Sequence, residues 1–320
     1  MTLKLHSVRH TPVLATLVLS AMLAGAAAVG AAEPAVQPVP QDSNPLSEVQ
    51  VIAAKLDPQQ LNHVAMKFVE SHAAIDPAIH QMSRWKKGLC PRVTGLTPEA
   101  DAFVKGRVEE VARSVGAQRG GVDPKCEVNV EIFFTTEPQK LLDHLAQAAP
   151  VLLGSSRSAG DTAFNRGIQS WYLTGTTSTA GFQPSGDGAD AALSTSLSDA
   201  VGNQPAGITG SYFTKGLTSE LRHVLIIVDR GKVATLSVRA IADYVAMLSL
   251  THMSSLDTCN ELPSIIDVLS SGCGERGKPT SLTDADTAYL KALYLSNRET
   301  NLNLQQGEMR DQMTKTILGK

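Results

Sequence analysis

Few residue patterns in this chain could support covalent or metal chemistry. H-E-x-x-H, G-x-S-x-G and P-loop patterns do not occur. Ser83-Arg84-Trp85-Lys86 fits S-x-x-K, in which a lysine amine one helical turn from a serine helps to deprotonate it. The companion patterns S-D-N and K-T-G are absent from the sequence. We therefore interpret the S-x-x-K match as a chance one.

The histidines do not form a metal-binding pattern. Those that follow the amino-terminal apolar segment are His63, His72, His80, His144, His223 and His252. The gap of nine residues between His63 and His72 places them on opposite sides of a helix rather than on one metal-binding face. We expect core or surface histidines with locally satisfied ring nitrogens, and neither a metal nor a cofactor.

The four cysteines, Cys90, Cys126, Cys259 and Cys273, favour disulfides. An even number in an exported chain suggests two bonds, and four cysteines allow three pairings. We favour Cys90–Cys126 and Cys259–Cys273, because each pair flanks one local unit of the chain. The alternative is a zinc site, but no C-x-x-C occurs and no histidine lies at zinc-finger spacing from the cysteines.

Residues 1–32 have the features of a cleavable secretory signal. Lys4 and Arg9 precede an apolar run from Val13 to Ala28, and small residues follow at 30–32, as signal peptidase requires. The alternative is a membrane anchor, but the run is short and no charged stop-transfer cluster follows it. We expect an exported protein, periplasmic or extracellular, with no membrane attachment after cleavage.

Charge and composition define the expected organisation of the remaining chain. The whole sequence has 28 Lys+Arg and 31 Asp+Glu, hence −3, and losing Lys4 and Arg9 with the signal gives −5. An acidic balance argues against a nucleic-acid partner. We expect a flexible leader at 33–46, a single globular domain at 47–297 with a Gly/Ser/Thr-rich insertion at about 154–216, and a polar tail at 298–320.

The patterning predicts alternating strands and helices. Helices are expected to begin at Asp57-Pro58, Thr97-Pro98, Pro138, Leu236 and Thr283, and strands are expected at 49–52, 90–96, 127–134, 168–173 and 223–228. The first of these helices carries one apolar stripe, Leu61 to Val69 at i, i+3, i+4, i+7 and i+8. We therefore predict an α/β (α+β) fold, in which a mixed sheet packs with helices.

The order of elements from Cys90 onward resembles the zincin fold of metallopeptidases. Pro263-Ser264-Ile265-Ile266 is similar to the Met-turn of the metzincins, with isoleucine where methionine is usual. The segment 282–294 is similar to the helix that follows this turn in serralysin-like enzymes. In this register, residues 242–252 align with H-E-x-x-H-x-L-G-L-x-H. The whole chain also resembles a group of exported bacterial proteins, which implies no particular activity.

The chain departs from the zincin motif at the residues that do the chemistry. Ala242 and Ala246 occupy the positions of the two helical zinc ligands, and Asp243 occupies that of the general base. Only His252 matches, as the third ligand. Because a catalytic zinc needs three protein ligands, one imidazole cannot hold it. The resemblance therefore implies a metallopeptidase-like scaffold without its metal.

Two functions follow from these features. The first is a non-catalytic binding or structural domain whose partner is an unknown protein or small-molecule ligand. Its candidate contact residues are Trp171 and Tyr172, because aromatic side chains anchor interfaces efficiently; the alternative is that they are ordinary strand residues on opposite faces. The second is a secreted hydrolase with an unrecognised site in a pocket near Asp243 and His252.

Overall fold

The helices begin where the sequence supplies capping side chains. Helix α2 (Pro58–His72) starts after Asp57, whose carboxylate accepts hydrogen bonds from the backbone of Gln59 and Gln60, both at 2.8 Å. Helix α8 (Asp284–Leu295) starts after Thr283, whose hydroxyl accepts from the backbone of Asp286 at 3.0 Å. Such caps satisfy amide groups that have no partner inside the helix. These local signals confirm the predicted starts of both helices.

A computed structural model describes residues 48–76, 79–117, 126–154, 163–178, 216–257, 259–270, 273 and 278–319. All of them belong to one unit, Pro45–Lys320. The expected signal at 1–32, the expected leader at 33–46 and most of the expected insertion at 154–216 lie outside the described residues.

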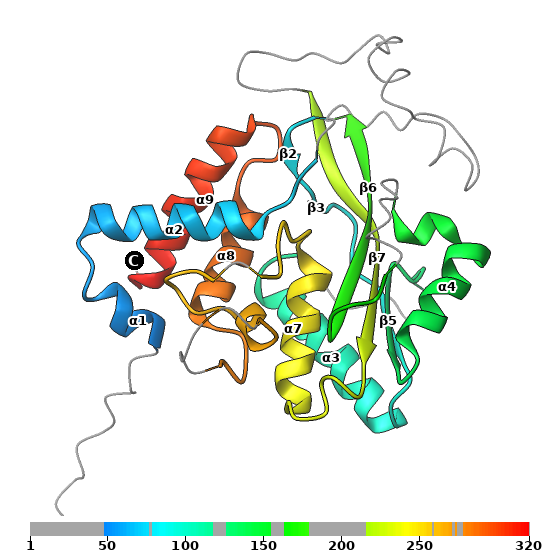
Figure 1. Cartoon of the computed structure of the whole chain (residues 1–320). Coiled ribbons are helices and arrows are strands. Elements are labelled where there is room, and N and C mark those ends of the chain that lie inside the picture. The colour runs from blue at the N-terminus through cyan, green and yellow to red at the C-terminus, as the bar shows by residue number, and fades with distance from the viewer. Residues whose placement is uncertain are drawn as a thin grey trace, which may run out of the picture. The chain divides into compact units, whose positions relative to one another are not determined.

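The remaining elements follow in chain order. They are α1 (Glu48–Ala53), β1 (Ile75–Asp76), β2 (Gln81–Met82), β3 (Arg84–Trp85), β4 (Pro91–Thr94), α3 (Pro98–Ser114), β5 (Val130–Thr135), α4 (Pro138–Ala148), η1 (Pro150–Leu153), β6 (Ile168–Ser178), β7 (Leu217–Asp229), α7 (Val238–Leu250), η3 (Ile265–Val268) and α9 (Leu302–Ile317). Helices and a mixed sheet together confirm the predicted α/β fold class (Figure 1).

The mixed sheet is built around β7. Strand β5 runs parallel to β7 from Val130 opposite Val224 to Thr135 opposite Asp229, and β4 runs parallel to β5 on its other side. Strand β6 pairs antiparallel along the opposite edge of β7. The short β3 pairs with residues 220–221 of β7, just before the residues that pair with β5. Strands β3 and β5 therefore share one edge of β7. Residues 224–228, in the strand predicted at 223–228, are all apolar and fully buried, as in a strand covered on both faces.

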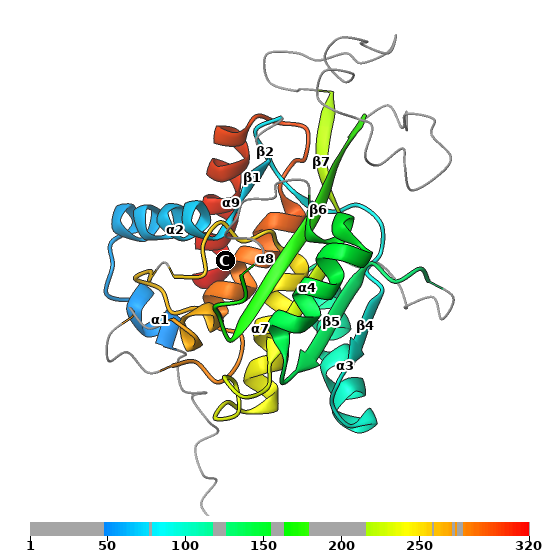
Figure 2. The ribbon, with the colours of Figure 1, turned by 45° about the vertical axis from the view of Figure 1, so that its right-hand side comes forward.

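Helices cover both faces of this sheet. Side chains of α3 and α7 pack with Val224 and Ile226 in the larger apolar cluster. Leu142 of α4 packs with Leu225 and Ile227 in a second cluster, on the other face. Figure 2 shows α4 in front of the strands and α7 behind them. Because successive side chains of a strand alternate between faces, one apolar strand supplies both clusters.

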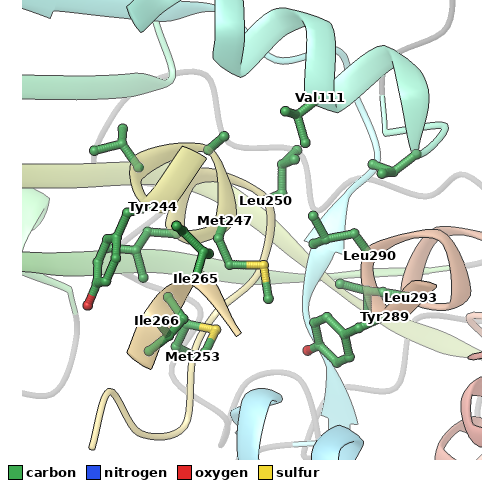
Figure 3. Packing of buried hydrophobic residues seen from close by; sticks show 14 of the residues in the cluster. Val111, Tyr244, Met247, Leu250, Met253, Ile265, Ile266, Tyr289, Leu290 and Leu293 are labelled. Carbon is green, nitrogen blue, oxygen red and sulfur yellow. The ribbon is translucent and has the colours of Figure 1, made fainter. Parts of the chain in front are cut away.

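A helical layer lies beside the sheet. Helices α2, α8 and α9 pack against one another, with α1 next to α8 and α9 (Figure 1). Tyr289 and Leu290 of α8 lie in the same apolar cluster as Met247 and Leu250 of α7 (Figure 3). Every residue of α7 from Ala240 to Leu250 is buried. The helix that the zincin register singles out is therefore a core helix.

Two expectations about the ends of the domain are wrong. The segment 49–52 was expected to be a strand and is helical in α1, where Val49 and Ala53, one turn apart, are the buried residues. The segment 298–320 was expected to be a polar tail outside the domain, but its helix α9 packs into the domain, and Gln305, Met309, Met313 and Ile317 form the buried stripe of α9. Tertiary packing decides both segments, since their local patterns are weak.

Candidate functional site

Asp243, the residue in the general-base position of the zincin register, is a fully buried junction residue. Its Oδ1 accepts a hydrogen bond from Nε of Arg107 on α3. Its Oδ2 accepts from Nε of Arg239 at 3.1 Å and from the backbone amide of Leu282 at 2.9 Å. Burial tends to lower the pKa of Arg107, but hydrogen bonds to Asp243 and Glu110 outweigh it and raise that pKa. The Asp243 carboxylate thus joins α3, α7 and the segment before α8.

His252 lies in a different environment, just beyond the end of α7. Its ring packs on the ring of Tyr172 in β6, with centroids 4.3 Å apart and planes inclined by 30°. Its backbone carbonyl accepts from the amide of Ala74 at 2.8 Å. Burial lowers the pKa of His252 to about 4, against the opposing effect of the Asp76 carboxylate. The ring is therefore neutral at physiological pH, and its buried Nδ1 has no hydrogen-bond partner among the described residues.

The structure does not give Asp243 and His252 a common partner. The donors to Asp243 come from α3, α7 and the segment before α8, whereas His252 contacts β6 and the end of α2. The zinc-ligand positions of the register, Ala242 and Ala246, are both fully buried among apolar side chains. Among the described residues, no hydrogen bond is seen between Asp243 and His252, the two residues of the expected pocket.

Trp171 and Tyr172 lie on opposite faces of β6, as neighbouring strand residues do. Trp171 is buried in the cluster beneath α4. Tyr172 packs against the larger cluster, and its hydroxyl donates to the backbone oxygen of Leu248 on α7 at 3.1 Å. Burial raises the pKa of this hydroxyl. Both aromatic side chains are mainly packed against the helices of the domain.

A buried Ser–His–Asp cluster that no sequence pattern indicated lies at the junction of α2, η3 and α8. The Ser264 hydroxyl oxygen lies 2.6 Å from Oδ1 of Asp286 and 3.2 Å from Nε2 of His72, within hydrogen-bond distance of both. Serine rather than histidine is the central member, and all three residues are at most 3 % exposed. A hydrolytic triad needs histidine in the centre and a reachable serine, so this cluster joins elements instead.

The S-x-x-K pattern is not a catalytic pair. Its first residues form β3 and the turn before it rather than a helix. Ser83 is buried, with its hydroxyl 2.7 Å from that of Ser219, while Lys86 is exposed. Arg84 is also buried, and its NH1 donates to Leu293 and Ser296 at the end of α8. These side chains hold the strand to its neighbours.

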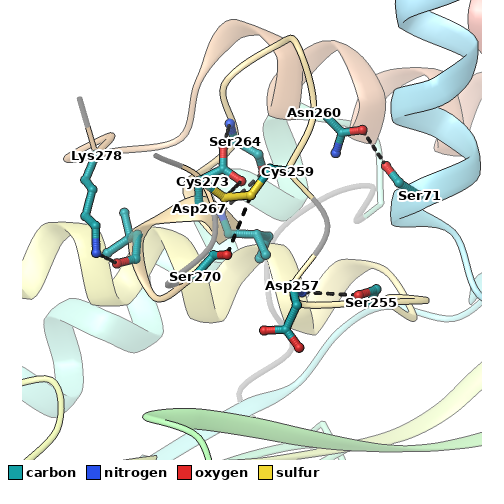
Figure 4. The surroundings of a disulfide bond; sticks show 12 residues. Ser71, Ser255, Asp257, Cys259, Asn260, Ser264, Asp267, Ser270, Cys273 and Lys278 are labelled. Carbon is teal, nitrogen blue, oxygen red and sulfur yellow. Dashed lines mark hydrogen bonds between the residues drawn. A yellow bond between two sulfur atoms is a disulfide. The ribbon is translucent and has the colours of Figure 1, made fainter. Parts of the chain in front are cut away.

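Both predicted disulfides are present. Cys90 pairs with Cys126 and Cys259 pairs with Cys273, with Cα separations of 6.0 and 5.2 Å. Figure 4 shows the second bond, which closes the loop that carries Ser264 and Asp267. All four cysteines are therefore in disulfides, and none is left as a thiolate for the alternative zinc site. Within the described ranges, no group of three or more His, Cys, Asp or Glu side chains could hold a metal ion.

Two cavities among the described residues lie away from Asp243 and His252. One of about 430 Å³ occupies the fork between β3 and β5, lined by Trp85, Lys87, Gly88, Cys126, Glu127, Val128, Asn129, Glu220, Leu221, Arg222 and His223. Burial lowers the pKa of His223, although Glu131, 3.7 Å from its Nε2, opposes this. A second cavity, of about 560 Å³, follows the polar surface of α9. The expected pocket residues line neither of them.

The outer edge of β6 carries unpaired backbone groups. The amide of Asp229 donates to Gly167, and that of Ser219 points away from β6, to the side chain of Gln81. These two bonds fix which β6 residues bond to β7, because bonded and non-bonded pairs alternate along an antiparallel ladder. The N–H and C=O groups of the non-bonded β6 residues point away from β7. The outward residues are Ile168, Ser170, Tyr172, Thr174 and Thr176. Ile168 is fully buried, and the carbonyl oxygen of Tyr172 lies against the backbone of Gly154. Ser170, Thr174 and Thr176 are partly exposed.

Comparisons with protein families, with curated proteins and with solved structures found no match to this chain. Among the described residues, no helix is both long enough and apolar enough to cross a membrane.

Proposed function

We propose that this chain is an exported, non-catalytic binding protein that takes an extended polypeptide segment along the outer edge of β6. The observation that carries the proposal is the outward direction of the backbone groups of Thr174 and Thr176, which are partly exposed at this edge. An exposed strand edge is a template for a further strand, which binds through main-chain hydrogen bonds. Such binding needs no catalytic side chain.

The buried polar groups support binding rather than hydrolysis. A general base needs a free carboxylate oxygen within reach of the proton it removes. Both oxygens of Asp243 accept hydrogen bonds, two of the donors being arginines, and the side chain is fully buried. The alternative hydrolase would have to break this junction before Asp243 could act.

A metallopeptidase-like scaffold remains our proposal for the origin of this arrangement. The order of elements that the resemblance implies runs through β4, α3, β5, α4, β6, β7 and α7. Alanines at the ligand positions leave His252 alone beside β6, where its ring packs on Tyr172. The two disulfides and the amino-terminal segment support export to an oxidising compartment.

Proline at Thr174 tests the proposal. The amide of Thr174 faces outward, so proline there removes an edge donor and leaves the bonds between β6 and β7 in place. The probe is a displayed library of random twelve-residue peptides, panned on the mature protein, with the selected peptides measured by calorimetry. We expect Thr174→Pro to weaken their binding at least tenfold and the control Thr174→Ala to bind as the parent does.

Three results would count against it. One is the absence of any enriched peptide, and another is equal affinity for the proline variant while its circular dichroism and melting temperature match those of the control. A third is cleavage of the selected peptides that is abolished by His252→Asn. This third result would restore the hydrolase hypothesis.

A further inference from the structure

The cluster formed by His72, Ser264 and Asp286 has a geometry that fixes its protons. Nδ1 of His72 lies 2.9 Å from the backbone oxygen of Phe68, which can only accept a hydrogen bond. Nδ1 must therefore carry a proton to form a bond there. The other ring nitrogen, Nε2, faces the Ser264 hydroxyl at 3.2 Å, and that hydroxyl faces Asp286 Oδ1 at 2.6 Å.

Two proton arrangements satisfy all of these contacts. In the first, a protonated Asp286 donates to Ser264, which donates to Nε2 of a neutral His72. In the second, a charged His72 donates through Nε2 to Ser264, which donates to an ionised Asp286. The heavy atoms need not move between the two arrangements. Both contain one proton more than neutral histidine with ionised aspartate. They differ in whether Asp286 or His72 carries that proton and, with it, in the direction of the Ser264 hydroxyl.

Other proton counts leave a contact unsatisfied. With one proton fewer, Nε2 and the carboxylate compete for the single Ser264 proton, or the ring changes tautomer and Nδ1 opposes the Phe68 oxygen. The Ser71 hydroxyl, 3.0 Å from Nδ1, offers little relief because Phe68 O and Asn260 Oδ1 are also acceptors within 3.0 Å of it. With one proton more, His72 is charged and Asp286 is protonated, so both donate to the Ser264 oxygen. The positive charge of His72 is then buried without a negative partner, and the Ser264 hydroxyl proton has no acceptor in the cluster.

We infer that His72 and Asp286 hold a single proton in common, passed through the Ser264 hydroxyl, and that this shared proton keeps the junction of α2, η3 and α8 intact through mildly acidic conditions. The titratable groups that face the imidazole are Asp286 and Tyr289 from α8, with the Tyr289 ring centroid 5.5 Å away. Asp267 in η3 lies one step further, accepting from the Ser264 amide at 2.9 Å.

The individual pKa values agree with this count. Burial lowers the pKa of His72 from 6.5 to about 4, while burial raises the pKa of Asp286 from 3.8 to about 6 despite its hydrogen bonds. The two changes nearly cancel in the total number of protons bound. Folding therefore takes up or releases few protons at this pair, and the pair adds little pH dependence to stability.

Breaking the pair from either side should reveal opposite pH dependences. In Asp286→Asn the amide group mimics the protonated carboxyl group and donates to Ser264, so only the histidine titrates. Its pKa is lowered on folding, so its stabilisation is complete above 6.5 and is lost as pH falls toward 4. In His72→Gln only the aspartate titrates. Its pKa is raised on folding, so its stabilisation is complete below 3.8 and is lost as pH rises toward 6.

The experiment is urea unfolding of the mature protein between pH 4 and 7, with the double variant His72→Gln/Asp286→Asn as the reference. Relative to this reference, we expect the unfolding constant of Asp286→Asn to rise by roughly 100-fold from pH 7 to pH 4, since one pKa unit is a tenfold change and the folded-state pKa lies at the end of this range. We expect that of His72→Gln to rise by roughly 50-fold from pH 4 to pH 7, by the same conversion. The parent should change by no more than about threefold.

Opposite slopes for the single variants with a flat parent would support the shared proton. Slopes of the same sign, or a parent as steep as either variant, would overturn it. If a variant does not fold, nitrogen-15 spectra of the His72 ring and carbon-13 spectra of the Asp286 carboxyl group in the parent decide. Near pH 5, one proton in total on Nε2 and the carboxyl group supports the inference, and none or two refutes it.

Discussion

Replacing Asp243 should destabilise the fold rather than abolish a chemical step. Its side chain is fully buried, and those of its arginine partners Arg107 and Arg239 are 12 % and 49 % exposed. Removing the carboxylate leaves Arg107 mostly buried with only Glu110 beside it, and leaves the Leu282 amide without its acceptor. Loss of one partner from a buried ion pair costs about 3–5 kcal/mol, and a buried unsatisfied amide about 1–3 kcal/mol.

We therefore expect Asp243→Ala to lower the free energy of unfolding by about 4 kcal/mol, since the two costs overlap in one site. Asp243→Asn should cost nearly as much, because its amide group faces an arginine on one side or the Leu282 amide on the other. The control is Glu110→Gln. Glu110 contacts the same arginine at 2.8 Å but is 60 % exposed, so its loss should cost less than about 1 kcal/mol.

Urea unfolding followed by circular dichroism measures these differences, and an unchanged slope with urea shows that the same surface is exposed. A double-mutant cycle between Arg107 and Asp243 isolates the pair. The reasoning would be refuted if Asp243→Asn unfolded within about 1 kcal/mol of the parent. Loss of peptide cleavage in that stable variant would make Asp243 a catalytic residue.

Further outcomes concern glycines and disulfides. Gly95 has a φ of +106°, and a Cβ there would lie 2.0 Å from the backbone oxygen of Phe134, so Gly95→Ala should cost at least about 2 kcal/mol by urea unfolding. The matched control Gly106→Ala, inside α3 with open space around its Cβ, should stabilise by about 0.5–1 kcal/mol; equal effects would contradict this account. Replacing Cys259 and Cys273 by serine opens a loop of 14 residues and should cost about 3 kcal/mol in the free energy of unfolding. An unchanged melting temperature in that double variant would show that the bond does not constrain the loop.

The parts of this fold that the sequence predicts are those determined by contacts within a few residues. Asp57 and Thr283 start helices because each cap bonds an amide two or three positions away. The alternation in β5 and the apolar run in β7 likewise report local burial. The disulfide pairing was also predictable, because both bonds close short local loops, with separations of 36 and 14 residues.

Packing partners distant in sequence determine the segments that were predicted wrongly. Four residues at 49–52 fit a strand or a helix equally well, and contacts with α8 and α9 select the helix. In α9 the stripe of Gln305, Met309, Met313 and Ile317 has helical spacing, but polar neighbours hide it. Its contacts with α2 and α8 bury this stripe, and no local signal indicated them.

The same separation explains why the candidate site could only partly be predicted. The zincin register drew attention to Asp243, yet its partner Arg107 lies 136 positions earlier. His72 and Ser264 are 192 positions apart, and no spacing rule connects them. A carboxylate or a histidine in the sequence shows only that a group able to act as an acid, a base or a ligand is present. Its hydrogen-bond partners in the folded chain decide whether the group is free to act in that way.

In this protein, several side chains that could act as an acid, a base or a ligand instead form hydrogen bonds between neighbouring helices and strands. Asp243 joins α3 to α7, Asp286 and His72 join α8 to α2, and Arg84 joins β3 to the end of α8. The unused hydrogen-bonding capacity among the described residues includes the outward main-chain groups of Thr174 and Thr176 at the edge of β6. Peptide groups recognise an extended partner by its backbone. A chain that retains buried junctions and an open strand edge is suited to binding, and the Thr174 variants separate this role from catalysis because they change the edge and leave every junction in place.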